Sequence, residues 1–260
     1  MLRIKTEEEI EVLRHNNLLV SKTLAEVAKL LKPGVSTLEL DKRAEEYIRD
    51  NDAVPGFKGY HGFPNTLCTS VNSQVVHGIP SSYQLKEGDI VSVDCGVKKD
   101  GYYGDTAFTF EVGEVDPKVK QLLKVTREAL WEGVINAIVG KRLGDIGYSV
   151  QKHAEDNGFS VVREMVGHGL GSNLHEAPEV PNYGKRGKGP KLPDGLVLCI
   201  EPMINMGSKE ILQDRDGWTI GTLDKMPSAH FEFAVVIRKG KADVLSTFDY
   251  IDQVISNINS

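Results

Sequence analysis

The sequence predicts a single α+β domain, and three observations support this prediction. Two capping-box patterns each precede apolar residues at helical spacing, a hairpin signal lies in the first half, and the last third contains several short strand-like segments. With 260 residues, 40% of them hydrophobic and 26% charged, the chain can bury one large core. No linker composition interrupts it, so we treat residues 1–260 as one domain.

The expected helices begin at recognisable caps. Thr6 and Glu9 match a capping box, and apolar residues then recur at helical spacing until Pro33. Ser36 and Glu39 repeat the pattern. A third start is favoured where a proline can occupy the first helical position. We therefore expect helices over residues 6–33, 36–51, 117–139 and 145–157.

The expected strands lie between and after these helices. Residues 54–80 alternate glycine, proline and aromatic residues, which predicts loops with short strands that present side chains. Elsewhere, β-branched and alternating segments predict strands over residues 90–97, 106–112, 160–166, 197–204, 218–223, 230–237 and 244–248.

The first two of these strands form a predicted hairpin, joined by the sequence KKDG. If the chain turns about Lys99 and Asp100, then Asp94 and Asp105 face each other across the two strands, with Cβ atoms roughly 4.5 to 5.5 Å apart. Two exposed acids flanking a turn are the alternative. If both are buried, a cation between them would reverse their repulsion.

Two parts of the chain share a sequence pattern, which we call the internal echo. Residues 85–96 (LKEGDIVSVDCG) and 192–203 (LPDGLVLCIEPM) place a leucine, an acid, a glycine, a strand and a carboxylate at the same offsets. Chance similarity is one explanation, because an acid–glycine turn before a strand is common. The other is a duplicated unit whose pseudo-symmetric halves, approximately 1–112 and 113–248, each donate a carboxylate to a shared central site.

Composition excludes several classes of protein. A formal net charge of -6 argues against a general binder of nucleic acid or anionic membranes. The one basic run, residues 185–191, is rich in glycine and is expected to be a solvated loop. The first twenty residues mix charged and apolar types, so we expect neither a signal peptide nor a membrane span. Cys68, Cys95 and Cys199 favour reduced thiols and a cytoplasmic location.

Five candidate metal ligands lie in apolar or glycine-bracketed segments, namely Asp94, Asp105, His168, Glu201 and Glu232. Taken alone, the histidine could be a hydrogen-bonded structural residue. Four carboxylates in one core need compensating positive charge, because an unpaired buried charge is costly. Together the five favour divalent cations, and the excess of carboxylates suggests two ions that share ligands.

This ligand set indicates hydrolytic chemistry. Carboxylates with one imidazole make a hard, oxygen-rich site that suits Mn, Fe(II) or Co, and Zn is also allowed by the general order of affinities. Two such ions, roughly 3.5 to 4 Å apart, can bridge a water, lower its pKa towards neutrality and leave a hydroxide poised to attack a polarised carbonyl.

Further candidates lie beside turns. His77 and His175 could donate to an oxyanion or to a substrate carbonyl, and a surface turn is the alternative for each. An apolar pocket could be walled by Tyr60, His61, Phe63 and Trp218, although a core role explains any one of them equally well.

Six segments resemble, in order and spacing, the type I methionine aminopeptidases of the bacterial kind: VDCGVKKDGYYGDTAF, GHGLG, LHEAPEVPNYG, IEPM, DGWT and HFEF. These enzymes are part of the larger pita-bread family, which includes Xaa-Pro peptidases and creatinase. The resemblance covers essentially residues 5–248. It implies a pseudo-symmetric α+β fold with a central antiparallel sheet, flanking helices and two divalent metal ions, Co, Mn, Fe(II) or Zn, in the cleft.

The resemblance also implies a role for each ligand. By position, Asp94 resembles a bidentate ligand, Asp105 and Glu232 resemble bridging carboxylates, and His168 resembles the imidazole ligand. Glu201 resembles a ligand that also shuttles protons.

Other site residues follow in the same way. His175 resembles the residue that steadies the tetrahedral intermediate, and His77 the residue that contacts the substrate peptide. The methionine pocket of the family falls at Tyr60, His61, Phe63, Cys68 and Trp218. Tyr103 and Phe233 replace histidines that are frequent in the family. Neither position is a ligand, so we expect tuning rather than loss.

The implied activity is removal of the N-terminal methionine from nascent proteins and peptides, with a preference for a small second residue. The implied mechanism is attack of a metal-bridged hydroxide on the first peptide carbonyl. We expect a cytoplasmic monomer that makes at most a transient contact with the ribosome, with no membrane or specific nucleic-acid partner. The basic loop at 185–191 looks longer than in many relatives.

Two other functions stay open at this point. One is a Xaa-Pro aminopeptidase, disfavoured because this chain lacks the additional amino-terminal domain of those relatives. The other is a non-catalytic module that binds peptides, histones or RNA, disfavoured because such modules have usually lost ligands and all five are present here.

Overall fold

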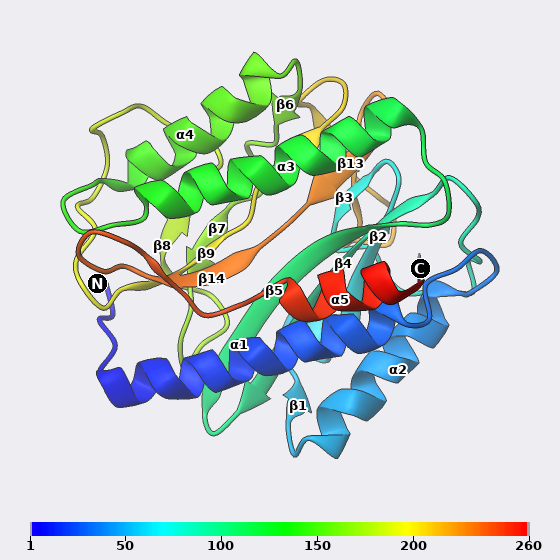
Figure 1. Cartoon of the computed structure of the whole chain (residues 1–260), viewed down its shortest axis with the longest axis horizontal. Helices are drawn as coiled ribbons and strands as arrows, with labels where there is room; N and C mark the ends of the chain where they lie inside the picture. Colours follow the sequence, from blue (N-terminus) through cyan, green and yellow to red (C-terminus); the bar gives the residue numbers. More distant parts are fainter. Residues whose placement is uncertain (1, 259–260) are drawn as a thin grey trace.

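The computed structural model describes residues 2–258 and has helices packed on one side of antiparallel strands, with the strands behind the helices in Figure 1. Helices α1 (Glu7–Ala28), α2 (Thr37–Asp50) and α5 (Asp249–Ile258) cover one part of the strands, and α3 (Pro117–Asn136) and α4 (Leu143–Asp156) cover the other. The α+β class and four predicted helices are confirmed. In the described part of the chain, no helix is both long and apolar enough to span a bilayer.

The helices begin where the capping patterns predict. The Thr6 hydroxyl accepts from the Glu9 N–H at 3.3 Å, and the Glu9 carboxylate accepts from the Thr6 N–H at 2.8 Å. Ser36 and Glu39 make the same pair of bonds. Helix α1 ends at Ala28 and does not run to Pro33 as expected.

Four sheets follow, and every pairing between their named strands is antiparallel. The first contains β1 (Val54–Pro55), β2 (Leu67–Val71), β4 (Ile90–Lys99) and β5 (Tyr102–Glu111). A five-stranded sheet has the order β15 (Asp243–Val244), β14 (Phe233–Val236), β9 (Val197–Ile200), β7 (Gly167–Gly169) and β8 (Glu176–Val180). One three-stranded sheet has the order β13 (Ser228–His230), β10 (Met203–Asn205), β6 (Ser160–Val161). Another three-stranded sheet has the order β11 (Ile211–Gln213), β12 (Ile220–Thr222), β3 (Gln74–Val76).

The predicted hairpin exists, but its predicted register was wrong by two residues. Asp94 lies opposite Ala107, and Asp105 lies opposite Gly96. The cause is the turn, which is centred on Asp100 and Gly101, both with positive φ, as a two-residue type I′ loop requires. A shift of two preserves the alternation of side chains, so the two aspartates still share one face as diagonal neighbours.

Two predicted strands are each broken at a glutamate. The segment expected over 197–204 splits into β9 and β10 at Glu201, and the segment expected over 230–237 splits into β13 and β14 at Glu232. The register is the same on both sides of the break, because Ile200 pairs with Phe233 and Met203 pairs with His230. Glu201 and Glu232 are therefore opposite each other where the strand pair passes from one sheet to the next.

The remaining strand predictions were too long or misplaced. The strands expected over 160–166 and 218–223 shrink to β6 and β12. Instead of a strand over 244–248, the chain forms only β15 and then helix α5, which was not predicted.

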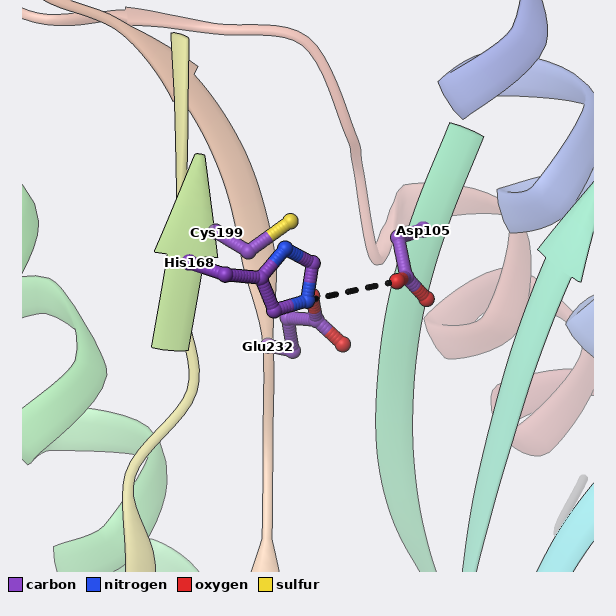
Figure 2. A group of neighbouring side chains, drawn as sticks. All are labelled: Asp105, His168, Cys199 and Glu232. Atoms are coloured by element: carbon purple, nitrogen blue, oxygen red, sulfur yellow. Dashed lines mark ion pairs between the residues drawn. The ribbon is translucent and has the colours of Figure 1, made fainter. Parts of the chain in front are cut away.

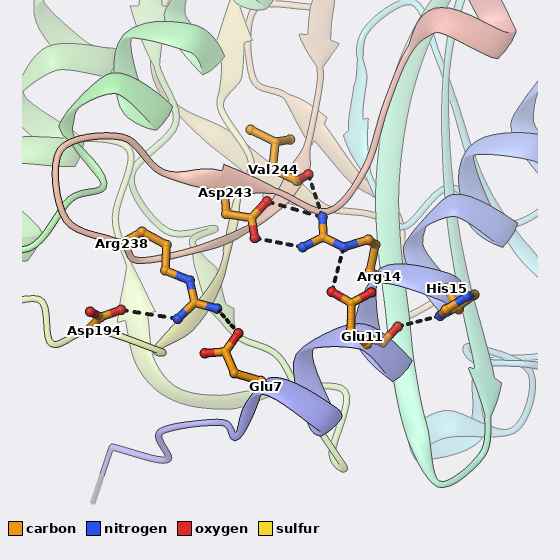
Figure 3. Close-up of polar contacts among 8 residues, drawn as sticks. All are labelled: Glu7, Glu11, Arg14, His15, Asp194, Arg238, Asp243 and Val244. Carbon is orange, nitrogen blue, oxygen red and sulfur yellow. Dashed lines mark hydrogen bonds and ion pairs between the residues drawn. The ribbon is translucent and has the colours of Figure 1, made fainter.

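Polar contacts tie helix α1 to the segment that follows β14 (Figure 3). Both terminal nitrogens of Arg14 bond the Asp243 carboxylate, at 2.7 and 3.2 Å. The Arg238 guanidinium bonds Glu7 at 2.6 Å and Asp194 at 3.3 Å. These contacts hold helix α1 against the segment that follows β14.

The two related segments have helices of equal length and strands that begin at equivalent positions. Helices α2 and α4 are each 14 residues long, and strands β4 and β9 begin at Ile90 and Val197, the equivalent positions of the echo. Each strand follows a glycine with positive φ, Gly88 or Gly195. The division into two pseudo-symmetric halves stays a prediction, and these matches support it.

Candidate active site

All twelve residues that the sequence singles out line one cavity of about 590 Å³. They come from both parts of the chain, and the full set is Tyr60, His61, Phe63, Cys68, His77, Asp94, Asp105, His168, His175, Glu201, Trp218 and Glu232. Tyr103 and Phe233, where the sequence departs from the family pattern, do not line it.

The first part of the chain contributes two aspartates. The carboxyl groups of Asp94 and Asp105 are near enough that each changes the pKa of the other. Cys68 lies opposite Asp94 on the neighbouring strand β2. The side chain of Asp105 is buried, and its backbone N–H donates to the amide oxygen of Asn17 in helix α1. The hairpin and helix α1 together fix this side of the site.

The second part contributes a histidine and two glutamates. His168 Nε2 lies 3.5 Å from Glu201 Oε1 and 3.7 Å from Asp105 Oδ2. Its Nδ1 lies 3.0 Å from the carbonyl oxygen of Gly169. Burial lowers the pKa of His168 to about 3, so the ring is neutral. Because a carbonyl only accepts, Nδ1 carries the hydrogen, and the lone pair of Nε2 faces the carboxylates.

The carboxylates strongly favour a cation among them. Burial raises the pKa of Asp94, Asp105, Glu201 and Glu232, and neighbouring carboxylates raise it further for the last three. Within the described chain, no lysine or arginine forms an ion pair with any of the four. One buried oxygen on each of Asp94, Asp105 and Glu232 has no hydrogen-bond partner. These donors fit divalent metal ions.

One compact group of donors stands out within the site (Figure 2). Asp105, His168, Cys199 and Glu232 each offer a ligand atom, and these atoms lie within 4.8 Å of one another. All four side chains are buried. Three of them belong to the predicted ligand set, and the fourth is a thiol that the sequence prediction did not include.

A second imidazole stands beside the ligands. The rings of His175 and His168 are perpendicular, with centroids 4.3 Å apart, and the Tyr60 hydroxyl lies 3.0 Å from His175 Nδ1. His77 has a positive φ of 60°, and burial lowers its pKa to about 4. Burial also lowers the pKa of His175, so the neutral ring, which can donate one N–H to a substrate, is favoured for both histidines.

Aromatic side chains wall one side of the cavity. Phe63 and Trp218 meet edge to face, with ring centroids 5.2 Å apart, and Tyr60 and His61 meet at 4.3 Å. Phe63 and Cys68 are buried, and Trp218 is half-buried. The backbone N–H of Trp218 donates to the Asp216 carboxylate at 2.8 Å, which holds this loop in place.

Sequence reasoning missed two buried residues of the site. His230 Nε2 lies 3.8 Å from Glu201 Oε2 and has no hydrogen-bond partner, and burial lowers its pKa to about 3. Cys199 precedes Glu201 by two positions, so the alternation of a strand places both on one face. That spacing was the available signal for Cys199. The same spacing applies to His230, which precedes Glu232 by two positions.

Comparison with known proteins agrees with this geometry. Residues 11–239 match metallopeptidase family M24. A methionine aminopeptidase of Clostridium perfringens is 48% identical over 95% of this chain and 99% of its own length. Methionine aminopeptidase 1 of Bacillus subtilis is 46% identical over the same shares of the two chains.

Solved structures extend the agreement to the fold. The crystal structure of methionine aminopeptidase from Rickettsia prowazekii superposes with a TM-score of 0.94 at 40% identity, over 95% of this chain and 100% of that one. The pita-bread fold and the resemblance found in the sequence are both confirmed. The chain belongs to metallopeptidase family M24 and, within that family, to the methionine aminopeptidases.

Proposed function

We propose that this protein is a metal-dependent aminopeptidase that removes the N-terminal methionine from peptides and proteins and favours a small second residue. The observation that carries the proposal is the meeting of four buried carboxylates and one neutral imidazole beside an aromatic-walled cavity. Relatives named methionine aminopeptidase, 46 to 48% identical over nearly the whole chain, support the choice of substrate.

The ligand residues would hold two divalent ions. Asp94, Asp105, Glu201 and Glu232 would hold them through carboxylate oxygens, and His168 through Nε2. When bound, such ions lower the pKa of coordinated water and polarise a carbonyl oxygen. Mn, Co, Fe(II) and Zn all suit donors of this kind.

The other residues of the site would bind substrate and move protons. Glu201 has one oxygen 3.5 Å from His168 Nε2 and the other 3.8 Å from His230 Nε2, so a proton could be held at the oxygen on the His230 side. His175 would stabilise negative charge developing on the scissile carbonyl oxygen. His77 would contact the substrate peptide next to the bond that breaks.

The apolar side of the cavity would take the methionine side chain. Tyr60, His61, Phe63, Cys68 and Trp218 would form this pocket, and contacts between sulfur and aromatic rings favour a thioether there. Binding of the free amino terminus next to the metals would limit cleavage to one residue.

Peptide assays test this function. Release of methionine from a Met-Ala-Ser peptide should require Mn, Co or Fe(II), should stop with a chelator and should return when metal is restored. Asp105→Ala should abolish it. An active metal-free enzyme, or cleavage of Ala-Pro peptides in preference to Met-Ala peptides, would contradict the proposal.

We further propose that the protein acts on nascent chains, as a cytoplasmic monomer. Its three cysteines are buried and unpaired, which suits a reducing compartment. The basic loop 185–191 is exposed and available for a transient contact with ribosomal RNA. Light scattering tests the monomer. Sedimentation with ribosomes at low and high salt, comparing wild type with Lys185→Glu/Lys188→Glu, tests the contact.

A further inference from the structure

We propose that Cys199 is an additional metal ligand, which gives this site a preference for thiophilic cations such as Zn²⁺ and Co²⁺ over Mn²⁺. The inference rests on the proposed metal-dependent function and adds a sulfur donor to the five oxygen and nitrogen ligands. It concerns which ion the site selects.

The donor atoms are close enough to serve one ion. The Cys199 sulfur belongs to a group with Asp105, His168 and Glu232 whose ligand atoms lie within 4.8 Å of one another. Zinc holds nitrogen and oxygen at about 2.0 to 2.2 Å and sulfur at about 2.3 Å, so two ligands of one ion are at most roughly 4.5 Å apart. Shifts of a few tenths of an ångström would complete the set.

The sulfur of Cys199 lies beside the ligand atoms. Cys199 is on β9, and its sulfur is within 4.8 Å of the ligand atoms of Asp105, His168 and Glu232. The residue opposite Cys199 on β14 is Ala234, whose methyl group leaves the sulfur room. In Figure 2 the sulfur points to the side of the group on which Asp105 lies.

Two neighbours of Cys199 have oxygens that a bound ion would satisfy. Glu232 is 2% exposed and Asp105 is 3% exposed, yet each has a buried oxygen without a hydrogen-bond partner. Buried polar atoms are ordinarily satisfied, so two orphaned oxygens beside a thiol point to an ion rather than to ordinary packing.

The other two cysteines provide a contrast. Cys68 lines the cavity, and Cys95 is buried next to Asp94 in the sequence. Neither belongs to the compact donor group. Burial in this protein therefore does not by itself place a thiol among the ligands.

The chemistry of sulfur sets the expected preference. The thiolate, not the thiol, binds metals, so Cys199 would release its proton to solvent as the ion enters. Thiolate ligands favour Zn and Co, whereas Mn favours oxygen donors. Removing the sulfur should therefore weaken zinc binding much more than manganese binding.

Cobalt reports the bond directly. Metal-free full-length protein is titrated with Co²⁺ alone, anaerobically and with reductant, while near-ultraviolet absorption is followed for a thiolate-to-cobalt charge-transfer band. We expect the band in wild type and in Cys68→Ala, and expect it to be absent in Cys199→Ala and Cys199→Ser. Circular dichroism verifies that each variant is folded, and the serine variant serves if the alanine variant is not.

Zinc and manganese affinities provide a second measurement. In competition with a chelator, Cys199→Ala should weaken Zn²⁺ binding by about tenfold or more and change Mn²⁺ binding by less than about threefold. Stoichiometric Co²⁺ binding by wild type without the band overturns the proposal, as does a band that survives in Cys199→Ala or an equal loss of both affinities. Failure of the proposed function is distinguishable, because wild type would then bind no metal or would release no methionine with Mn²⁺.

Discussion

The backbone N–H of Glu232 donates to the carbonyl oxygen of Ala107 at 3.0 Å, and this bond joins the two parts of the chain at the centre of the site. Ala107 lies opposite Asp94 in the hairpin, so the bond sets the separation between the carboxylates of Asp94 and Glu232. His230 and Thr109 add two more bonds along the same junction, at 2.7 and 2.9 Å. These three hydrogen bonds position the backbone of β5 against the segment that carries Glu232.

Replacing Glu232 by glutamine should separate metal binding from folding. Burial raises the pKa of the Glu232 carboxyl and so disfavours its charged form without metal, and a neutral isostere should therefore leave the free energy of unfolding nearly unchanged. At metal one hundred times the dissociation constant, wild type should gain about 2.7 kcal/mol. If the variant binds about a hundredfold more weakly, its gain falls to about 0.4 kcal/mol.

Urea unfolding with and without Mn²⁺ measures both gains. Glu179→Gln, at an exposed glutamate that also lines the cavity, is the matched control and should keep the full gain. Equal stabilisation of Glu232→Gln and wild type by metal would show that this carboxylate is not a ligand.

His175→Ala should lower kcat for a Met-Ala-Ser peptide by about 10² to 10³-fold, the effect typical of losing a group that stabilises an oxyanion. Metal affinity by calorimetry should not change. Tyr60→Phe removes only the 3.0 Å contact to His175 Nδ1 and should cost about tenfold or less. His15→Ala, at an exposed histidine of α1, is the control, and the role fails if it lowers kcat as much as His175→Ala does.

Trp218→Ala should open the pocket and act mainly on recognition of methionine. Its edge-to-face contact with Phe63 would be lost, and kcat/KM for Met-Ala-Ser should fall by about tenfold or more, chiefly through KM. The chain offers a matched tryptophan, Trp131, which is 42% exposed on helix α3. Initial rates across peptide concentrations should show no change for Trp131→Ala, and a similar loss in both variants would refute the assignment.

The stability of the protein should depend on pH through Asp145, whose carboxylate accepts a hydrogen bond from the backbone of the basic loop 185–191. Burial alone would raise the pKa of Asp145, but the N–H groups of Gly187 and Arg142, at 2.7 and 2.8 Å, and the charges of Lys141 and Arg186 lower it overall. Because the folded pKa is below the unfolded value of about 3.9, this stabilisation is present above about pH 4 and is lost as the pH falls.

Asp145→Ala should therefore cost about 1 to 2 kcal/mol at pH 7, and the difference from wild type should close below about pH 4. Urea titrations at several pH values measure the difference. Asp156→Ala, at an exposed acid at the other end of α4, should change stability by about 0.5 kcal/mol or less. A difference for Asp145→Ala that is independent of pH would contradict the argument.

The features predicted correctly from the sequence are those that depend on neighbours along the chain. The capping boxes at Thr6 and Ser36 are local, and both helices begin there. The prediction of the hairpin register was wrong, and the cause is also local, because the turn lies at Asp100 and Gly101, one residue later than expected. The alternation of side chains survived the error, and so the shared face of Asp94 and Asp105 was right.

Features that depend on distant partners could not be predicted. The apolar segments around Glu201 and Glu232 read as continuous strands, and they break only because each passes between two sheets. Helix α5 was missed because the preceding apolar residues suggested a strand, although Phe248 is buried in the core, where its ring packs against Phe233. The burial of the carboxylates was the one long-range property that the residue types alone predicted.

The junction between Ala107 and Glu232 has a consequence for damaged copies of the protein. A polypeptide cut short by a premature stop codon or by proteolysis before residue 232 would retain acids but no complete catalytic centre, and would be inert. Both parts of the chain must therefore be present in one folded body before a peptide can be hydrolysed.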